Sequence, residues 1–298
     1  MNTIKLIAAW AIFLLANSAY CQKIRVLDDA GTRIELAQPA QRIITLAPNL
    51  AELVYAAGAG HAMVAATRYS DYPVAVKKLP LVGDAFALNL ERIATLQPDV
   101  VLVWLSGTPE RQRSALKALA KRQGFAVFES EIRNVAEIGS TLKRIGWMAG
   151  TQRTAQVQAT AIDTQWQALT LQYAQTAPVT VFYQVWDAPL MTFNGQHIVS
   201  QAIRTCGGVQ GFDDAAALTP TVSREAVLAF NPQSIVGGGE SASALSAWKK
   251  LPQMQAVKNQ QLHTIDAALL TRMGPRFVQA AAQLCQTIAL ARQPPPAR

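Results

Sequence analysis

Histidines, cysteines and clustered acidic residues build most catalytic and metal sites, and in this chain they are sparse. The three histidines, His61, His197 and His263, lie far apart in the sequence. There is no G-x-S-x-G nucleophile elbow, no phosphate-binding Walker loop and no H-E-x-x-H zinc motif. The sequence therefore predicts no catalytic residues, no metal site and no cofactor, and it favours a binding protein over an enzyme.

His197 is the histidine for which two roles can be argued. It follows the Asn194-Gly195 turn, and an imidazole at such a place could ligate the iron of a haem. A surface histidine that binds nothing is the other interpretation, and the sequence favours it.

The chain has three cysteines, Cys21, Cys206 and Cys285. Cys21 lies at the edge of an N-terminal export signal, described below, which leaves two for the mature protein. Two thiols in an oxidising compartment often pair, and two buried free thiols are the alternative. No cysteine lies close enough to a histidine in the sequence to predict a zinc site.

Two glutamates occupy matching positions in two similar stretches. Glu91 follows Asn89, and Glu225 follows Ser223, so that each carboxylate comes two positions after a helix-capping residue. A proline stands seven positions after each glutamate, and a predicted strand follows. One such carboxylate complements a helix dipole, but a matched pair suits a partner with two-fold symmetry and basic sockets.

The elements that must position these residues alternate between short apolar runs and helical stretches. Between the two similar stretches, residues 151–174 contain no Gly or Pro, the residues that most weaken a helix. Apolar side chains recur there at steps of three and four, which predicts one long helix with a single apolar stripe. The stripe consists of Ala155, Ala159, Ile162, Trp166, Leu169 and Tyr173.

The predicted fold class is therefore α/β, with two Rossmann-like lobes whose central sheets are mostly parallel, joined by a single long backbone α-helix. The predicted divisions are a signal peptide at 1–21, an N-terminal α/β lobe at 22–149, the linking helix at 150–175, a C-terminal α/β lobe at 176–292 and a disordered tail at 293–298.

Two local expectations concern helix boundaries. Asn49 follows the predicted strand at 42–46 and is expected to cap a helix that ends at Ala57. In the second lobe, a helix is expected around residues 242–254.

Composition excludes several classes of protein. Hydrophobic residues make up 50% of the chain and charged residues 15%, which is typical of a globular protein and not of a disordered one. The formal net charge is +8, yet no run of Lys and Arg is longer than two residues. A scattered basic surface is therefore expected, and no nucleic-acid partner is predicted.

The first residues predict export. A positive start at Lys5 precedes an eleven-residue apolar stretch at 6–16, and small residues follow at 17–19. This apolar stretch is too short for a comfortable membrane span and is typical of a secretory signal peptide. Cleavage is expected after Ala19 or Cys21, which predicts a periplasmic protein.

Taken together, six motifs resemble the helical-backbone class of substrate-binding proteins of ABC importers, and within it the cobalamin-binding branch. The resemblance covers nearly the whole mature chain. The motifs are RIITLAP at 42–48, YSDYP at 69–73, NLERI at 89–93, CGG at 206–208, VSRE at 222–225 and RMGPR at 272–276.

The resemblance implies a ligand and a membrane partner. The ligand would be cobalamin or a related corrinoid, which is transported rather than used as a cofactor. Tyr69 matches a tyrosine that packs on the corrinoid, and Arg272 falls in the pocket loop. Glu91 and Glu225 match the two glutamates that engage arginines of the dimeric permease, which works with its ATPase.

The resemblance also implies a disulfide between Cys206 and Cys285, and a monomeric protein. It departs from the cobalamin branch at two places, where the family carries pocket tryptophans and this chain has Ala85 and Thr219-Pro220. The aromatic residues predicted to replace them are Phe86, Trp104 and Trp186. Because of these departures, a haem or ferric-siderophore carrier of the same class is the alternative, and a periplasmic enzyme on the same scaffold is the alternative outside it.

Overall fold

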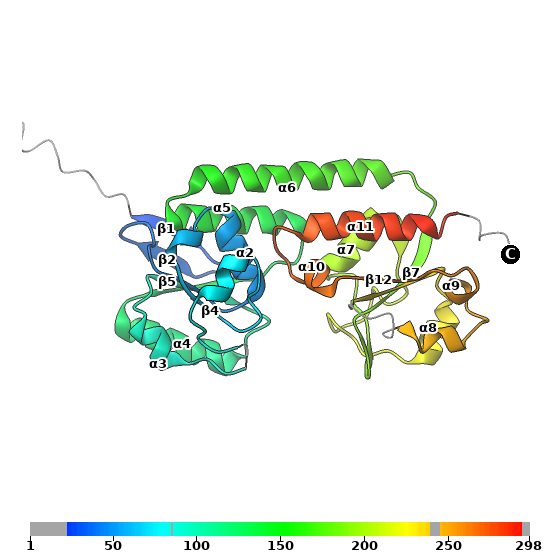
Figure 1. The fold of residues 1–298 in the computed structure, drawn as a ribbon, viewed down its shortest axis with the longest axis horizontal. Helices are drawn as coiled ribbons and strands as arrows, with labels where there is room; N and C mark the ends of the chain where they lie inside the picture. The colour runs from blue at the N-terminus through cyan, green and yellow to red at the C-terminus, as the bar shows by residue number, and fades with distance from the viewer. Residues whose placement is uncertain (1–22, 85, 239–244, 294–298) are drawn as a thin grey trace, which may run out of the picture.

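The computed structural model describes residues 23–293, apart from residue 85 and residues 239–244. The predicted signal peptide and most of the predicted tail lie outside these residues. Figure 1 shows two lobes side by side beneath one long helix. The predicted fold class, two α/β lobes joined by a backbone helix, is confirmed.

The N-terminal lobe is built on a four-stranded parallel sheet with the strand order β4-β3-β5-β6. These strands are β3 (Ile43–Thr45), β4 (Met63–Ala66), β5 (Val100–Trp104) and β6 (Ala126–Ser130). Their near-continuous apolar runs suit a sheet that is covered on both faces. A separate antiparallel hairpin consists of β1 (Ile24–Leu27) and β2 (Arg33–Leu36). The helices are α2 (Pro48–Ala56), η1 (Gly60–Ala62), η2 (Val74–Lys78), α3 (Leu90–Thr95), α4 (Glu110–Gln123) and α5 (Val135–Ala149).

The C-terminal lobe repeats this plan. Its sheet is also parallel and four-stranded, in the order β10-β7-β11-β12. These strands are β7 (Val179–Gln184), β10 (Gly208–Val209), β11 (Ser234–Gly238) and β12 (Leu262–Ile265), and a small hairpin pairs β8 (Trp186–Asp187) with β9 (Leu190–Met191). The helices are α7 (Ile198–Thr205), α8 (Arg224–Phe230), η4 (Trp248–Lys250), α9 (Gln255–Lys258), α10 (Ala267–Thr271) and α11 (Phe277–Leu290).

The two sheets have the same topology, which explains the internal similarity in the sequence. In each lobe the first of the four strands in chain order (β3, β7) lies inside the sheet, next to the third (β5, β11). A short helix with a side-chain cap precedes this third strand, α3 before β5 and α8 before β11. The Asn89 side chain accepts from the amide of Arg92, and Ser223 accepts from that of Ala226. Both predicted caps are confirmed.

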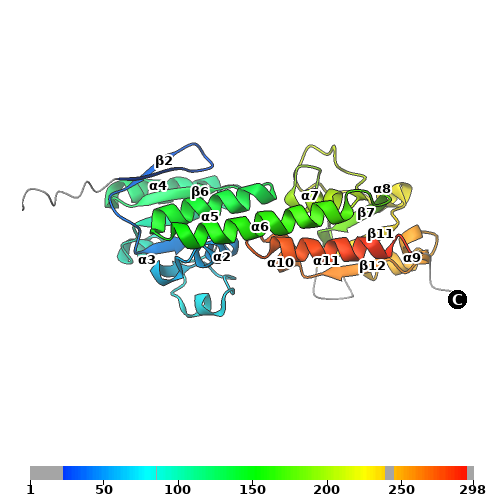
Figure 2. The same ribbon diagram turned by 90° about the horizontal axis from the view of Figure 1, so that it is seen from above.

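The backbone helix α6 (Gln152–Tyr173) is 22 residues long, about 33 Å at 1.5 Å per residue. Figure 2 shows it running across both lobes. It packs along α5 of the N-terminal lobe and contacts α11 of the C-terminal lobe. The predicted apolar stripe is buried except for Trp166, which is partly buried against the same core.

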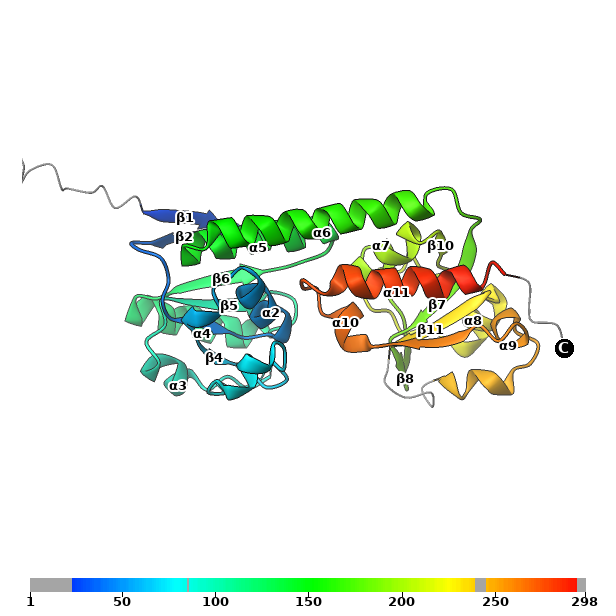
Figure 3. The same cartoon turned by 45° about the horizontal axis from the view of Figure 1, so that its top comes forward.

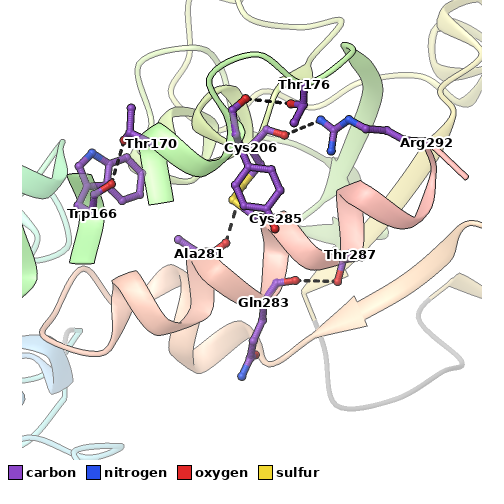
Figure 4. Close-up of a disulfide and its surroundings, with 10 residues drawn as sticks. Trp166, Thr170, Thr176, Cys206, Ala281, Gln283, Cys285, Thr287 and Arg292 are labelled. Atoms are coloured by element: carbon purple, nitrogen blue, oxygen red, sulfur yellow. Dashed lines mark hydrogen bonds between the residues drawn. A yellow bond between two sulfur atoms is a disulfide. The ribbon is translucent and has the colours of Figure 1, made fainter. Parts of the chain in front are cut away.

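The disulfide between Cys206 and Cys285 joins α7 to α11 (Figure 4). Both cysteines are fully buried, and the Arg292 guanidinium donates to the Cys206 carbonyl oxygen at 2.7 Å. Of the two alternatives for these thiols, pairing is therefore confirmed. Closing a loop of 79 residues stabilises the folded state by about 4–5 kcal/mol in the chain-entropy model.

Two expectations about helix boundaries are wrong. The helix α2 begins two residues earlier than expected, with Ala47 as its N-cap and Pro48 in its first position, and Asn49 is buried in its first turn. The fixed φ of proline and its missing N–H suit that first position. The structure describes residues 245–254 of the helix expected at 242–254, and no single helix covers them. A 3₁₀ turn there ends before Pro252, because proline disfavours helical backbone at the residue before it.

The contact between α5 and α6 generates a prediction about glycine. A Cβ on Gly146 would lie 2.3 Å from the Ala155 Cβ, whereas one on Gly139 of the same helix would meet its nearest atom at an ordinary 3.5 Å. We expect Gly146→Ala to destabilise the protein by about 1–3 kcal/mol through overpacking. Gly139→Ala should be neutral, or should stabilise it by up to about 1 kcal/mol through helix propensity. Urea unfolding of both variants measures this, and equal effects would contradict the packing described.

Candidate functional site

A cavity of about 510 Å³ lies between the two lobes, and we call it the interlobe cavity. Its walls come from segments that follow the carboxyl ends of β3, β5, β6, β7 and β12, where open parallel sheets bind ligands. The surface is largely apolar, as is usual for small-molecule sites. The main apolar contributors are Pro48, Trp104 and Ile132 from one lobe and Phe193, Leu218 and Met273 from the other.

Trp104 is the last residue of β5 and forms part of the N-terminal wall. The loop after it folds back onto the indole, since a Cβ on Gly107 would lie 2.0 Å from that ring. Glu131 fixes the same loop, because its carboxylate accepts from the Ser106 amide at 2.8 Å and from the Ser106 hydroxyl at 2.9 Å. The position of the tryptophan is thus set by a polar anchor next to the cavity.

His197 is buried on the C-terminal wall, so the surface position expected from the sequence is wrong. It is the N-cap of α7, and its Nδ1 accepts from the Val199 amide at 3.2 Å. Its ring stacks on Phe193 with centroids 3.5 Å apart, and Phe193 stacks on Tyr183 at 5.5 Å. Burial lowers the pKa of His197 to about 4, so the imidazole is neutral at pH 7.

A cluster of charged residues joins the lobes beside the cavity. Glu52 of α2 receives two hydrogen bonds from Arg276, and Arg272 pairs with Asp71 of the N-terminal lobe. The hydrogen bond from Arg272 is the main cause that lowers the pKa of Asp71. The bond to Glu52 is the main cause that raises the pKa of Arg276. Asp71 and Arg276 are therefore ionised at neutral pH.

The structure brings together two of the five residues predicted to bind ligand. Trp104 and Arg272 line the interlobe cavity. Tyr69, Phe86 and Trp186 are outside its lining and are 72%, 82% and 61% exposed, respectively. Tyr69 contacts a residue of the cavity wall through its backbone, because its carbonyl oxygen accepts a hydrogen bond from the Arg272 guanidinium at 3.4 Å. Contact of any of the five with a ligand stays a prediction.

Reasoning from sequence identifies only part of this wall. It does not single out Ile132, Phe193 or Leu218, and it wrongly expects His197 at the surface. The Asn194-Gly195 turn that follows Phe193 is the available signal, because a turn directly after a strand often faces a site in α/β proteins. What sequence could not give is the stacking of Phe193 between His197 and Tyr183.

Glu91 and Glu225 lie in the first turns of α3 and α8, and both are exposed. Figure 1 places these two helices on the side of the molecule away from α6, one in each lobe. Within the described ranges, neither carboxylate has an ion-pair partner.

Among the described residues, no group of three or more His, Cys, Asp or Glu side chains could hold a metal ion. The part of the chain that the structure describes also contains no helix with the length and apolar character needed to cross a membrane.

Comparison with known proteins finds relatives that match most of this chain. The chain is 33% identical over 256 residues to a vitamin B12-binding protein of Vibrio cholerae, covering 86% of this chain and 91% of that one. It is 36% identical over 250 residues to the vitamin B12-binding protein of Photorhabdus laumondii, covering 83% and 87%.

Solved structures agree with these relatives. The crystal structure of the periplasmic vitamin B12-binding protein of Vibrio cholerae superposes with a TM-score of 0.78 at 33% identity, covering 86% of this chain and 99% of that one. A periplasmic haem-binding protein of Vibrio cholerae shares the fold, with a TM-score of 0.70 at 20% identity over 83% of this chain and 98% of that one. The periplasmic binding protein family matches residues 43–269, and the chain belongs to that family.

Proposed function

We propose that this chain is the substrate-binding protein of an ABC importer, and that it binds cobalamin or a related corrinoid in the interlobe cavity. The observation that carries the proposal is the likeness to vitamin B12-binding proteins along nearly the whole of both chains. The largely apolar cavity between the lobes supports it, because a large planar ligand is held mainly by apolar contacts. Binding involves no chemistry on the ligand.

Trp104 and Arg272 are the residues on the cavity wall that we assign to ligand contact. Tyr69, Phe86 and Trp186 contribute from the exposed segments around it. Trp104 offers a broad apolar surface whose position is fixed by the loop packed on it. Arg272 offers guanidinium donors from the opposite lobe, next to Met273.

The alternative of a haem carrier has the weaker support. The haem-binding structures that resemble this chain are 20–23% identical to it, a level at which the likeness speaks to the fold alone. The geometry of His197 also opposes iron ligation. Because its Nδ1 accepts a hydrogen bond from the Val199 amide, the neutral ring carries its proton on Nε2, the other possible ligand atom.

Delivery requires export and a membrane partner. The N-terminal 21 residues would direct the chain to the periplasm, where the mature protein acts as a monomer. Glu91 and Glu225 would then dock onto basic sockets of a dimeric permease that works with its ATPase. Their exposure, their matched helix positions and their lack of intramolecular ion pairs within the described ranges support this role.

The assignment of Trp104 gives a prediction for ligand affinity. We expect Trp104→Ala to weaken cyanocobalamin binding roughly 10- to 100-fold, since burying an aromatic side chain in a binding site is worth about 1.5–3 kcal/mol. Trp147→Ala is the control, because that tryptophan is exposed on α5 and is not on the cavity wall. Isothermal titration of both variants decides it, and equal affinities would refute the assignment.

The docking assignment predicts a separation of binding from transport. The double variant Glu91→Arg, Glu225→Arg should bind cyanocobalamin as the wild type does but fail to support its uptake, because reversed charges repel basic sockets. Glu35→Arg reverses the charge of an exposed glutamate on the β1–β2 hairpin, where it also breaks a surface ion pair with Arg25, and it should leave uptake intact. Uptake of labelled cyanocobalamin by cells lacking their own binding protein is the measurement. Normal uptake with the double variant would eliminate the two-socket proposal.

The burial of His197 predicts a loss of stability in acid. Its pKa falls from 6.5 to about 4 on folding, so the folded state binds fewer protons, and stability present above pH 6.5 is lost as the pH falls toward 4. The loss attributable to this residue is at most about 3 kcal/mol.

Denaturant unfolding at pH 7, 5.5 and 4.5 tests this expectation. His197→Asn keeps a residue that can cap α7 and should flatten the dependence on pH. Burial also lowers the pKa of His263, so part of the slope should persist. The control His61→Asn changes an exposed histidine and should keep the wild-type slope. An unchanged slope in His197→Asn would show that His197 does not titrate as described.

A further inference from the structure

The strongest feature that the proposed function leaves unexplained is the ion pair between Glu52 and Arg276. Glu52 belongs to α2 of the N-terminal lobe, and Arg276 is the N-cap of α11 in the C-terminal lobe. The guanidinium Nε donates to Oε2 at 2.9 Å, and Nη2 donates to Oε1 at 2.5 Å. This two-pronged geometry fixes both the distance and the orientation of the two groups.

The surroundings make the pair difficult to break. The Glu52 side chain is 2% exposed, and a buried carboxylate without its partner is strongly unfavourable. The Arg276 guanidinium also lies over the Tyr72 ring, 3.9 Å from its centroid, a second contact with the N-terminal lobe. A Cβ on Gly274 would lie 3.6 Å from Glu52 Oε2, so the α10–α11 loop itself approaches α2 closely. Figure 3 shows this loop reaching toward α2.

The position of the pair relates it to the ligand site. Neither Glu52 nor Arg276 is among the described residues that line the interlobe cavity, but their neighbours Asn49 and Met273 are. The pair thus joins the two walls just outside the cavity, while α6 joins the lobes along another side (Figure 1). Because the lobes are joined both through α6 and through this ion pair, they cannot separate about α6 without breaking the contact between Glu52 and Arg276.

We propose that Glu52 and Arg276 form a clasp that holds the lobes of the free protein at the separation needed for binding, and that they are positioning residues for ligand affinity. This inference rests on the proposed function. A site that is held open at the right width before the ligand arrives loses less conformational freedom on binding, which raises affinity without any contact to the ligand. Arg272, which lines the cavity, supplements the clasp through its 3.5 Å approach to Glu52 Oε1.

The test compares two arginine variants. Arg276→Gln opens the clasp, and Arg144→Gln breaks the ion pair with Asp29, which lies within the N-terminal lobe. The two arginines are matched, with side chains 22% and 20% exposed. Spin labels at Lys121→Cys and Lys258→Cys, exposed sites on α4 and α9, report the distribution of interlobe distances in the ligand-free protein.

We expect Arg276→Gln to broaden the distance distribution and to weaken cyanocobalamin binding by roughly tenfold or more, whereas Arg144→Gln should leave both as in the wild type. Arg276→Lys keeps the positive charge but loses the two-pronged hydrogen bonding of the guanidinium. Its distance distribution and its affinity should lie between those of the wild type and Arg276→Gln, and it replaces Arg276→Gln as the test if that variant does not fold. A wild-type distribution in the Arg276 variants would overturn the clasp. A broadened distribution with wild-type affinity would overturn its role in binding.

Failure of the proposed function gives a different result. In that case the wild-type protein itself would not bind cyanocobalamin, and the proposed role of Glu52 and Arg276 in ligand affinity would also be wrong. The distance distributions need no ligand and would still decide whether the clasp holds the lobes.

Discussion

The constraint on which the rest of this structure depends is the packing of one continuous helix across two lobes. The helix α6 leaves α5 so little space that a glycine, Gly146, stands opposite Ala155, and it contacts α11 at its other end. Sharp kinks in a long helix arise mostly at proline, at Gly/Ser pairs or at π-bulges, and α6 contains neither proline nor glycine. The helix therefore joins the two lobes along one side, and the Glu52–Arg276 pair joins them beside the interlobe cavity.

That relation explains why the ligand site lies where it does. Each lobe is a parallel sheet whose carboxyl-end loops face the interlobe cavity, so that each lobe supplies one wall. The walls are stabilised locally, by Glu131 and Ser106 on one side and by the Tyr183–Phe193–His197 stack on the other. Some polar groups on these walls are already bonded to the protein itself, such as the Glu131 carboxylate with Ser106. What remains available to a ligand is chiefly apolar surface, which suits a carrier that must later release its cargo.

Much of the architecture could be predicted from the sequence because it rests on local signals. The stripe from Ala155 to Tyr173 predicted α6, and the caps Asn89 and Ser223 predicted the starts of α3 and α8. The similarity between these two stretches predicted lobes of the same plan. The start of α2 was predicted wrongly because two local preferences compete there. Asn49 favours the N-cap position and Pro48 favours the first helical position, and the helix begins at the proline.

The cavity wall was predicted only in part, since it depends on contacts between residues distant in sequence. Trp104 ends a strand, so its place at the cavity follows from topology. The burial of His197 does not, because it depends on the ring of Phe193 covering it. The ion pair between Glu52 and Arg276 spans 224 positions in the sequence, and no local pattern indicates which carboxylate an arginine will meet.

The central claim, that the interlobe cavity takes a corrinoid, is tested most directly by titrating the mature wild-type protein with cyanocobalamin and with haem in a calorimeter. If the cavity takes a corrinoid, one cyanocobalamin should bind per protein molecule, with an affinity well above that for haem. Binding of haem with no detectable binding of cyanocobalamin would contradict it.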